Sequence, residues 1–410
     1  MVRAAQSVLV LAVAAALGGT FSGCTSKPAV VPRSSARNLF HEQLNRSEAE
    51  TDARIAVAWQ QLFYGRDADQ RVYYPVGADE AYIADVASHD VRTEGLSYGM
   101  MIAVQLDHRA EFDRIWKWAR THHYHATGAL RGYFAWHADF SGRILDPGPA
   151  PDGEEWFVTA LFFAAHRWGR GAGIFDYEAE AQGLLHTMLH KSEEPQADGV
   201  TSIFDRTEAQ IVFAPGAEAA HFTDPSYHLP AFYEFWARWA ASPDDRAFCV
   251  RAALASRQLF RKAANPVTGL MPDYSEFDGR PHVRHGHEDF RFDAWRTLSN
   301  PALDYAWNHS DSWEVEQSDR VLRFLTAQGS PLPNTYRLDG TPLDKTESAG
   351  LYAMAATAGL ASNPELARPF VQKLWDMPIP DGKYRYYDGM LYLLALLEVG
   401  GRFHAYAPVR

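Results

Sequence analysis

Apolar residues recur every three to four positions along most of this chain, which is the spacing of helices that bury one face. The pattern predicts about twelve helices. They span residues 45–64, 94–107, 110–121, 153–168, 177–190, 226–241, 244–264, 290–307, 311–328, 347–360, 365–375 and 385–399. Asp224-Pro225 and Ser242-Pro243 support two of the starts, because each places a capping side chain before a proline.

The stretches between these helices are long and rich in Gly, Pro, Asp and aromatic residues, above all 128–150, 265–288 and 329–345. Short β hairpins fit there, but strands and helices do not alternate, which argues against a parallel sheet. No linker divides the chain after residue 40, so we expect one domain over 41–410. An all-α fold of six helical hairpins closed into a ring fits this helix count, and an open helical solenoid is the competing arrangement.

Residues 1–24 have the features of an export signal, with Arg3 at the positive end and an apolar core from Ser7 to Leu17. This core is too short for a permanent transmembrane helix. Phe-Ser-Gly before Cys24 resembles a bacterial lipoprotein box, although Phe21 stands where Leu is usual. We therefore expect a periplasmic or outer-membrane-anchored lipoprotein, attached only through lipidated Cys24, with residues 25–40 as its tether. Ordinary secretion is the alternative.

The composition excludes some partners. Among 410 residues, 47% are hydrophobic and 13% aromatic, which is typical of a globular protein. A net charge of -12 leaves no basic stripe for nucleic acid and would repel a polyanionic glycan, whereas a neutral glycan is unaffected. The second cysteine, Cys249, lies in an apolar helical pattern and is expected to be a buried, inert thiol. We expect a monomer that needs no cofactor.

Three acidic motifs carry the candidate chemistry: Glu94 in RTEGLSYGMM, Asp152 in PAPDGEEWF and Asp293 in FRFDAWR. Each carboxylate lies among aromatic and small residues, at or near the start of a predicted helix. Cleavage of a glycosidic bond needs two carboxyl groups in opposite protonation states. Aromatic faces stack on sugar rings, so the aromatic residues of these and the loop motifs are candidate substrate-binding platforms. They are Trp136, Trp156, Tyr227, Tyr384, Tyr386 and Tyr387.

The three carboxylates differ in their sequence surroundings. Glu94 must be buried to keep a proton, because a helix N-terminus alone would favour its ionised form. Asp152 fits a helix N-cap, and a capping loop can also present a carboxylate to a cleft. Asp293 and Arg296 are three residues apart on a predicted helix, so the arginine would keep Asp293 ionised, as a general base requires. The competing interpretation of this pair is a surface ion pair of little consequence.

Two further patterns are weaker. Residues 95–99, GLSYG, match the G-x-S-x-G nucleophile elbow of esterases, but that elbow requires a buried strand directly before it and the preceding residues are polar. His282, His285 and His287 cluster in one segment, yet their spacing matches no common zinc motif. We expect neither an esterase nor a metal site here, but a polar loop near the cleft.

The segments RTEGLSYGMMIAVQLDHRAEFDRIWKWA, PAPDGEEWFVTALFFAAHRWG, TDPSYHLPAFYEFWARWA and FRFDAWR, in this order, resemble glycoside hydrolase family 8. The likeness runs from about residue 40 to 405 and is greatest to the reducing-end xylose-releasing exo-oligoxylanases. It implies an (α/α)6 barrel and an inverting, metal-free hydrolysis. By this resemblance, Glu94 is the general acid, Asp293 the general base, and Asp152 the carboxylate that binds the sugar at the cleavage point.

The resemblance also implies roles for other residues. Tyr227 would help to hold the attacking water, Arg296 would lie beside the base, and Tyr384 and Tyr387 would contact sugar. Two departures stand out: Phe292 replaces a tyrosine common in relatives, and segment 338–351 lacks the histidine of the block that closes the cleft in exo-acting members.

The implied function is therefore release of xylose from the reducing end of neutral β-1,4-xylo-oligosaccharides. Endo-β-1,4-xylanase and endo-β-1,4-glucanase activity are the alternatives within the family. A non-catalytic glycan-binding lipoprotein is the alternative from another class, and the presence of both carboxylates argues against it.

Overall fold

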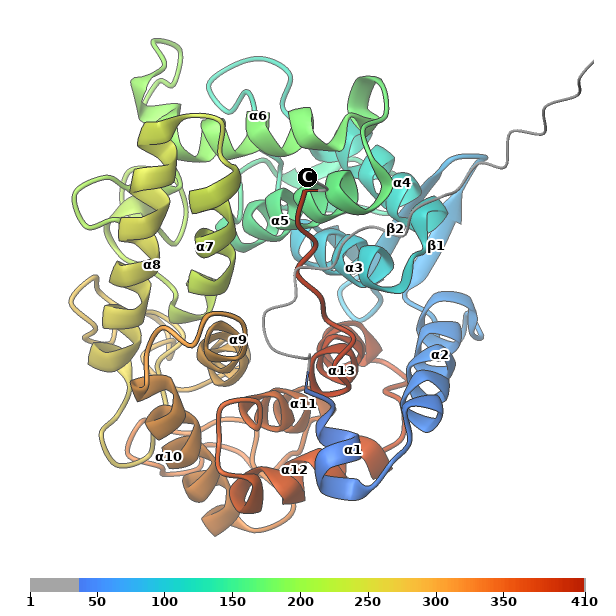
Figure 1. Cartoon of the computed structure of the whole chain (residues 1–410). Coiled ribbons are helices and arrows are strands. Elements are labelled where there is room, and N and C mark those ends of the chain that lie inside the picture. Colours follow the sequence, from blue (N-terminus) through green and yellow to red (C-terminus); the bar gives the residue numbers. More distant parts are fainter. Residues whose placement is uncertain (1–36, 409–410) are drawn as a thin grey trace, which may run out of the picture.

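The structure is a computed structural model that describes residues 37–408, and within them the chain forms thirteen α-helices. From α3 to α13 the odd-numbered helices lie nearer the centre, and the even-numbered helices from α2 to α12 lie outside them (Figure 1). Contacts between α13 and α3 close the ring. This arrangement is an (α/α)6 barrel, as the sequence predicted.

The inner helices are α3 (Thr93–Leu106), α5 (Pro151–Trp168), α7 (Pro230–Trp239), α9 (Ser299–Asn308), α11 (Ala349–Ala358) and α13 (Arg385–Val399). The outer helices are α2 (Glu48–Tyr64), α4 (Arg109–Trp118), α6 (Tyr177–His190), α8 (Pro243–Ala263), α10 (Trp313–Gln328) and α12 (Pro364–Asp376). Inner helices such as α11 and α13 are buried on almost every side, because their sequences are apolar all round. Outer helices such as α12 bury one stripe only.

Two predicted helices are divided in the structure. Segment 226–241 contains the 3-10 turn Pro225–Tyr227 and then α7, because Pro230 keeps Leu229 out of the helical conformation. Segment 290–307 contains the 3-10 helix Asp293–Leu298 and then α9. Pro301 lacks the N–H that would bond back to Thr297, so the regular α-helix begins only at Ser299.

Short strands accompany the helices. An antiparallel sheet has the order β1 (Tyr73–Val76), β2 (Glu80–Asp85), β3 (Asp90–Arg92), β4 (His137–Asp139), β5 (Ile144–Asp146). The hairpin β4–β5 lies in the long stretch 128–150 where a hairpin was expected, whereas β1 to β3 were not predicted. A second hairpin joins β6 (Phe204–Asp205) and β7 (Gln210–Ile211). Because β3 runs directly into α3, the sheet fixes where that helix begins.

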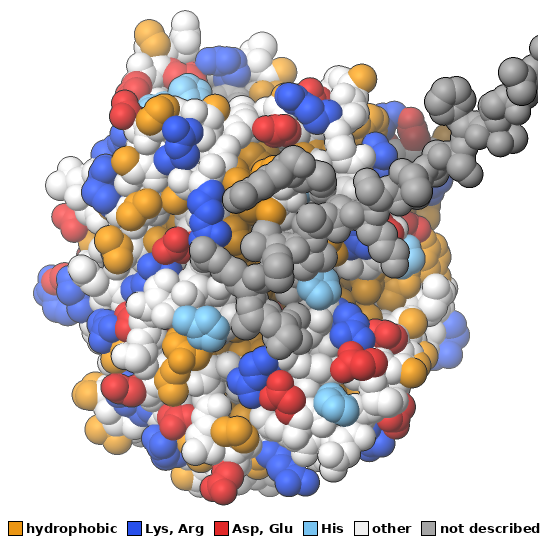
Figure 2. Space-filling model, in the orientation of Figure 1, with side chains coloured by type: hydrophobic (Ala, Val, Ile, Leu, Met, Phe, Trp, Pro, Cys, Tyr) orange, Lys and Arg blue, Asp and Glu red, His pale blue; other side chains and the backbone are white. Residues whose placement is uncertain are grey.

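The predicted export signal 1–24, Cys24 and most of the tether lie outside the described residues. The predicted tether end at residue 40 falls inside α1 (Leu39–Leu44), where Leu39 and Phe40 are buried and the helix packs on α12. Within residues 37–408, no helix combines the length and hydropathy of a membrane span. Cys249 is buried, as expected. On the face drawn in Figure 2, acidic and basic side chains are interspersed without a basic stripe.

Candidate active site

One buried guanidinium, that of Arg296, joins the three acidic motifs. Its Nη1 donates to Glu94 Oε2 (3.2 Å) and to Asp152 Oδ2 (2.8 Å). Its Nη2 lies 3.3 Å from Asp293 Oδ1. The carboxylates come from the first turn of α3, the first turn of α5 and the start of the 3-10 helix before α9. Residues far apart in the chain therefore meet at the ends of three inner helices.

Glu94 is largely enclosed but still reaches solvent. Its side chain is 15% exposed, and the Tyr386 hydroxyl donates to its Oε1 at 2.8 Å. Burial raises the pKa of Glu94 to about 7; Arg296 opposes the rise, Asp152 and Asp293 add to it, and Tyr386 opposes it. Burial therefore outweighs the helix N-terminus and the arginine, as a general acid requires.

Two glycines allow this close packing. A Cβ on Gly95 would lie 2.5 Å from the ring of Tyr386, so only glycine lets that tyrosine reach Glu94. A Cβ on Gly153 would lie 2.4 Å from Thr93 Oγ1, so glycine also lets α3 and α5 begin side by side.

Asp152 is buried and lies inside the first turn of α5. The N-cap of that helix is Ala150, without a side-chain hydrogen bond, and Pro151 occupies the first helical position. The expected N-cap role of Asp152 is therefore wrong. Its Oδ1 accepts the Gly153 N–H (2.8 Å), while Oδ2 binds Arg296. Burial raises the pKa of Asp152, and Arg296 opposes this effect.

Asp293 is the most accessible of the three, with 36% of its side chain exposed. The predicted pair with Arg296 forms, and because the arginine is buried it is not a surface ion pair. Since the guanidinium nitrogens share one carbon, the nearest oxygens of Glu94 and Asp293 lie at most about 9 Å apart, a limit that admits both inverting and retaining separations. Inverting glycosidases hold their two carboxyl groups about 6.5–9.5 Å apart.

Two more aspartates lie near Asp293. Asp273 Oδ1 accepts the Ala294 N–H (2.9 Å) and its Oδ2 binds His287 Nδ1 (2.9 Å). Asp224 is fully buried, and its Oδ2 has no hydrogen-bond partner within residues 37–408. Burial and then the charge of Asp293 raise the pKa of Asp224 well above its ordinary value. Asp273 and Asp224 are thus two further carboxyl groups close to Asp293.

The histidine-rich loop, residues 282–287, binds one of these carboxyl groups. His287 binds Asp273, whereas His282 binds a different carboxylate, that of Glu276 (2.8 Å). Their rings stack on Tyr274 and Phe222 respectively. The loop is therefore polar and lies next to the base, as the sequence predicted.

Three of the predicted aromatic contacts lie at the cluster. The Arg296 guanidinium carbon is 5.7 Å from the centre of the Tyr227 ring. The Tyr387 hydroxyl donates to the carbonyl of Phe292, directly before the base (3.0 Å). The Trp136 carbonyl accepts the Thr93 N–H at the start of α3 (3.0 Å).

The remaining platform candidates have other surroundings. Tyr384 is 68% exposed at the N-cap of α13, and the contact that the structure gives its ring is with Lys383. Trp156 is a core residue that packs edge-on against Tyr98, and Tyr386 is buried against Glu94. The expectation of sugar stacking is therefore wrong for Trp156 and Tyr386.

Sequence reasoning missed the roles of Tyr98 and Ser226. Arg296 Nη1 donates to the Tyr98 hydroxyl (2.7 Å) and Nη2 to Ser226 Oγ (2.9 Å). A signal existed for Tyr98, which lies four residues after Glu94 and so on the same face of α3. Nothing in the spacing pointed to Ser226, because its partner is 70 residues away.

The G-x-S-x-G pattern has a strand before it, contrary to expectation, since β3 ends at Arg92. Ser97 nevertheless lies buried inside α3, and its hydroxyl donates to the Glu94 carbonyl (2.9 Å). This serine is not presented on a strained turn, so it does not form a nucleophile elbow.

Comparison with known proteins agrees with this geometry. The sequence model of glycosyl hydrolases family 8 matches residues 78–401. A reducing-end xylose-releasing exo-oligoxylanase of Paenibacillus barcinonensis is 44% identical over 374 residues, covering 90% of this chain and 96% of that protein. Its counterpart in Halalkalibacterium halodurans is 41% identical, covering 91% of this chain and 95% of that protein.

Solved structures give the same picture. A catalytic mutant of a family 8 xylanase from Teredinibacter turnerae, in complex with xylohexaose, is 47% identical and superimposes with a TM-score of 0.87. The match covers 91% of this chain and 98% of that one. The exo-oligoxylanase of Paenibacillus barcinonensis, in complex with xylose, is 42% identical with a TM-score of 0.86, covering 90% and 97%.

Proposed function

The chain belongs to glycosyl hydrolases family 8, and on that premise we propose that it releases xylose from the reducing end of β-1,4-xylo-oligosaccharides with inversion. The chemistry rests on one observation: Glu94 and Asp293 share Arg296 yet differ in burial. The substrate rests on relatives named as reducing-end xylose-releasing exo-oligoxylanases at 41–44% identity.

The two carboxyl groups divide the reaction between them. Protonated Glu94 gives its proton to the oxygen that leaves as the glycosidic bond breaks. Ionised Asp293 takes a proton from a water molecule, whose oxygen forms the new bond to the anomeric carbon on the opposite face of the sugar. Exchange of protons with solvent then restores both groups.

Arg296 supports both roles. Its Nη2 lies 3.3 Å from Asp293 Oδ1 and holds that carboxylate in place. Arg296 also fixes the carboxylate of Asp152, whose Oδ1 and Oδ2 are both hydrogen-bonded inside the protein. We propose that Asp152 and Tyr227 hold the sugar and the attacking water, with Trp136 and Tyr387 as neighbouring sugar contacts.

The test is a product time course on xylohexaose labelled isotopically at its reducing end. The proposal predicts labelled xylose and unlabelled xylopentaose as the first products. If labelled xylobiose and xylotriose appear first, the proposal is wrong and the enzyme is endo-acting. If xylohexaose stays intact while cello-oligosaccharides are cleaved, the xylan assignment is wrong.

Endo cleavage of xylan is the second candidate, and two observations favour it. The Teredinibacter turnerae protein, named a xylanase, is 47% identical to this chain. Segment 338–351, where exo-acting members carry a closing block, has no histidine. In the structure this region follows Asn334, whose carbonyl accepts Trp295 Nε1 at 2.9 Å. The far end of the segment packs on the ring of Trp295, two residues after Asp293, because a Cβ on Gly350 would lie 3.0 Å from that ring.

We also propose that the enzyme is exported and held at the membrane through lipidated Cys24. This proposal rests on residues 1–24 alone. Mass spectrometry of the mature protein should find a diacylated Cys24 as the N-terminus. An unmodified N-terminus at another residue would contradict lipidation and indicate ordinary secretion.

A further inference from the structure

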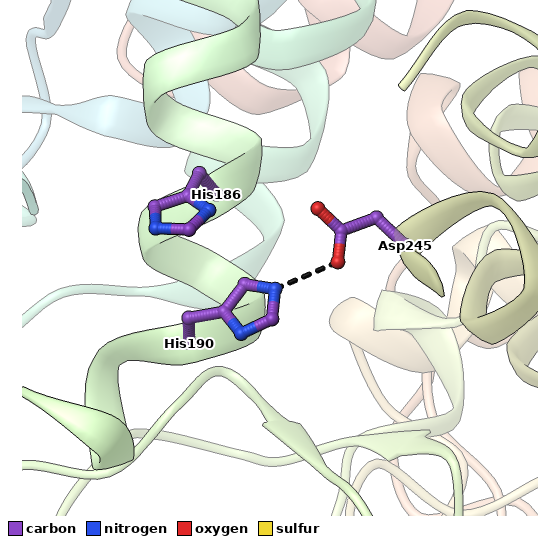
Figure 3. A group of neighbouring side chains, drawn as sticks. All are labelled: His186, His190 and Asp245. Carbon is purple, nitrogen blue, oxygen red and sulfur yellow. Dashed lines mark hydrogen bonds and ion pairs between the residues drawn. The ribbon is translucent and has the colours of Figure 1, made fainter. Parts of the chain in front are cut away.

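Two histidines and an aspartate meet on the outer ring, between two helices that take no part in the carboxylate cluster. His186 and His190 are one turn apart on α6, and Asp245 is in the first turn of α8 (Figure 3). One ligand atom from each of the three side chains lies within 4.8 Å of the other two. No motif spacing marked this group, because Asp245 is 55 residues from His190.

We propose that His186, His190 and Asp245 bind a divalent transition-metal ion, with Zn²⁺ as the best fit. Imidazole nitrogens and one carboxylate oxygen are common ligands of Zn²⁺, at about 2.0–2.2 Å. Ca²⁺ and Mg²⁺ prefer oxygen ligands and do not suit a pair of histidines. With three protein ligands, water completes the tetrahedron.

The group is partly preorganised. Asp245 is buried, and its Oδ1 lies 2.7 Å from His190 Nε2. The other nitrogen of His190, Nδ1, lies 3.0 Å from Glu193 Oε1. Metal-binding histidines usually bond a carboxylate through the nitrogen that does not bind the metal, because this fixes the tautomer. Glu193 occupies that outer position.

His186 supplies the adjustable ligand. Its ring stacks on that of His190 with centroids 4.6 Å apart, and it is exposed on α6. Because this side chain is exposed, its ring can turn toward the pair formed by His190 and Asp245 without displacing core residues. Binding of the metal ion would then link α6 to α8 and stabilise the folded chain.

If these three residues have only a structural role, the expected results are the opposite. If His190 is simply a charged bridge between Asp245 and Glu193, His186 is a surface residue with no function. In that case replacing His186 would change nothing, and Zn²⁺ would not bind in a defined ratio. His186 is therefore the residue that separates the two accounts.

The experiment uses the full, chelator-treated protein without an affinity tag, titrated with ZnCl₂ in a calorimeter. We expect one equivalent to bind. His186→Ala should weaken binding by at least tenfold, since even an outer carboxylate around a metal contributes about 10–100-fold. Asp245→Asn keeps a hydrogen-bond acceptor for His190 and should weaken binding similarly. His221→Ala, at another exposed histidine, is the matched control and should bind like the wild type.

Two further readouts make the test independent of heat signals. Co²⁺ should give the visible absorption of a tetrahedral site in the wild type and lose it in His186→Ala. Zn²⁺ should raise the Tm of the wild type but not that of His186→Ala. Equal Zn²⁺ binding by wild type and His186→Ala, or no binding by the wild type, overturns the proposal. If Asp245→Asn fails to fold, the exposed His186 variant decides alone.

Discussion

Two buried arginines each bind several carboxylates, but they do so in different ways. Arg296 touches Glu94, Asp152 and Asp293 through one oxygen each. Arg257, on α8, binds both oxygens of Asp304 on α9 (2.6 and 2.9 Å). Its Nη1 and Nη2 also donate to Glu234 Oε1 (3.1 Å each).

The difference shows how the same residue types are used for chemistry or for structure. At Arg257 the carboxylate of Asp304 is fully buried, so no ligand in solvent can reach it. Nearby Glu314 is also buried, and burial and then Asp304 raise its pKa to about 11. At Arg296, Glu94 and Asp293 remain partly exposed and each carboxyl group keeps an oxygen that the arginine does not bind. We expect function at Arg296 and stability at Arg257.

The largest expected effect is on turnover at the Arg296 cluster. Glu94→Gln and Asp293→Asn should each lower kcat by about 100- to 10,000-fold or more, because each removes one proton transfer. Binding of xylohexaose, measured by calorimetry, should change little. Turnover close to wild type in either variant would contradict the assignment of acid and base.

The same type of substitution at the other arginine should affect stability instead. Asp304→Asn and Arg257→Ala remove one partner of a buried ion pair, and breaking such a pair costs about 3–5 kcal/mol. We expect a lower midpoint in urea unfolding and an unchanged kcat per folded molecule. A loss of kcat without a loss of stability would show that the two clusters are not separate in function.

The pH dependence sharpens the comparison. The general acid must be protonated and the base ionised, so kcat/KM should be limited on both sides of an optimum. On the alkaline limb it should fall as the pH rises through about 7, the pKa of Glu94. Tyr386 donates to the ionised carboxylate and lowers this pKa. Tyr386→Phe should therefore move the alkaline limb to higher pH, by up to about one unit.

Tyr233 offers the matched control, because its hydroxyl donates to buried Glu155 as that of Tyr386 does to Glu94. Tyr233→Phe should leave the alkaline limb of kcat/KM in place. If both variants shift the alkaline limb equally, this limb does not report the titration of Glu94.

The smallest effects concern two helical glycines. Gly95→Ala forces the ring of Tyr386 away from Glu94, so we expect lower kcat in an otherwise folded enzyme. On α6, a Cβ at Gly183 meets nothing within 4 Å, so Gly183→Ala should stabilise the protein by about 0.5–1 kcal/mol without changing kcat. Thermal unfolding and steady-state rates measure both. Equal kcat in the two variants would mean that Tyr386 need not approach so closely.

Most of the helices were predictable because their apolar periodicity is strong. The bounds of α6 and α13 agree with the predicted 177–190 and 385–399. Short α1 and strands β1 to β3 were missed, since a few residues carry too little periodicity to be recognised. The division at Asp293–Leu298 was missed because the pattern continues through it while Pro301 changes the hydrogen bonding.

The individual residues of the site were predictable from the sequence, but their meeting in space was not. Spacing paired Asp293 with Arg296, but Glu94 is 202 residues from that arginine and Asp152 is 144 residues from it. Only the closed ring brings these helix ends together. The candidate metal group shows the same limit: His186 and His190 share a helix face in the sequence, while Asp245 joins them only in the fold.

The most direct test of the central claim is proton NMR of the first turnovers on xylohexaose. Cleavage of a β-bond with inversion by Glu94 and Asp293 predicts that the new reducing end of xylopentaose appears first as the α-anomer. The β-anomer then grows by mutarotation. Initial appearance of the β-anomer would contradict the account, because it requires a covalent intermediate and therefore a different role for Asp293.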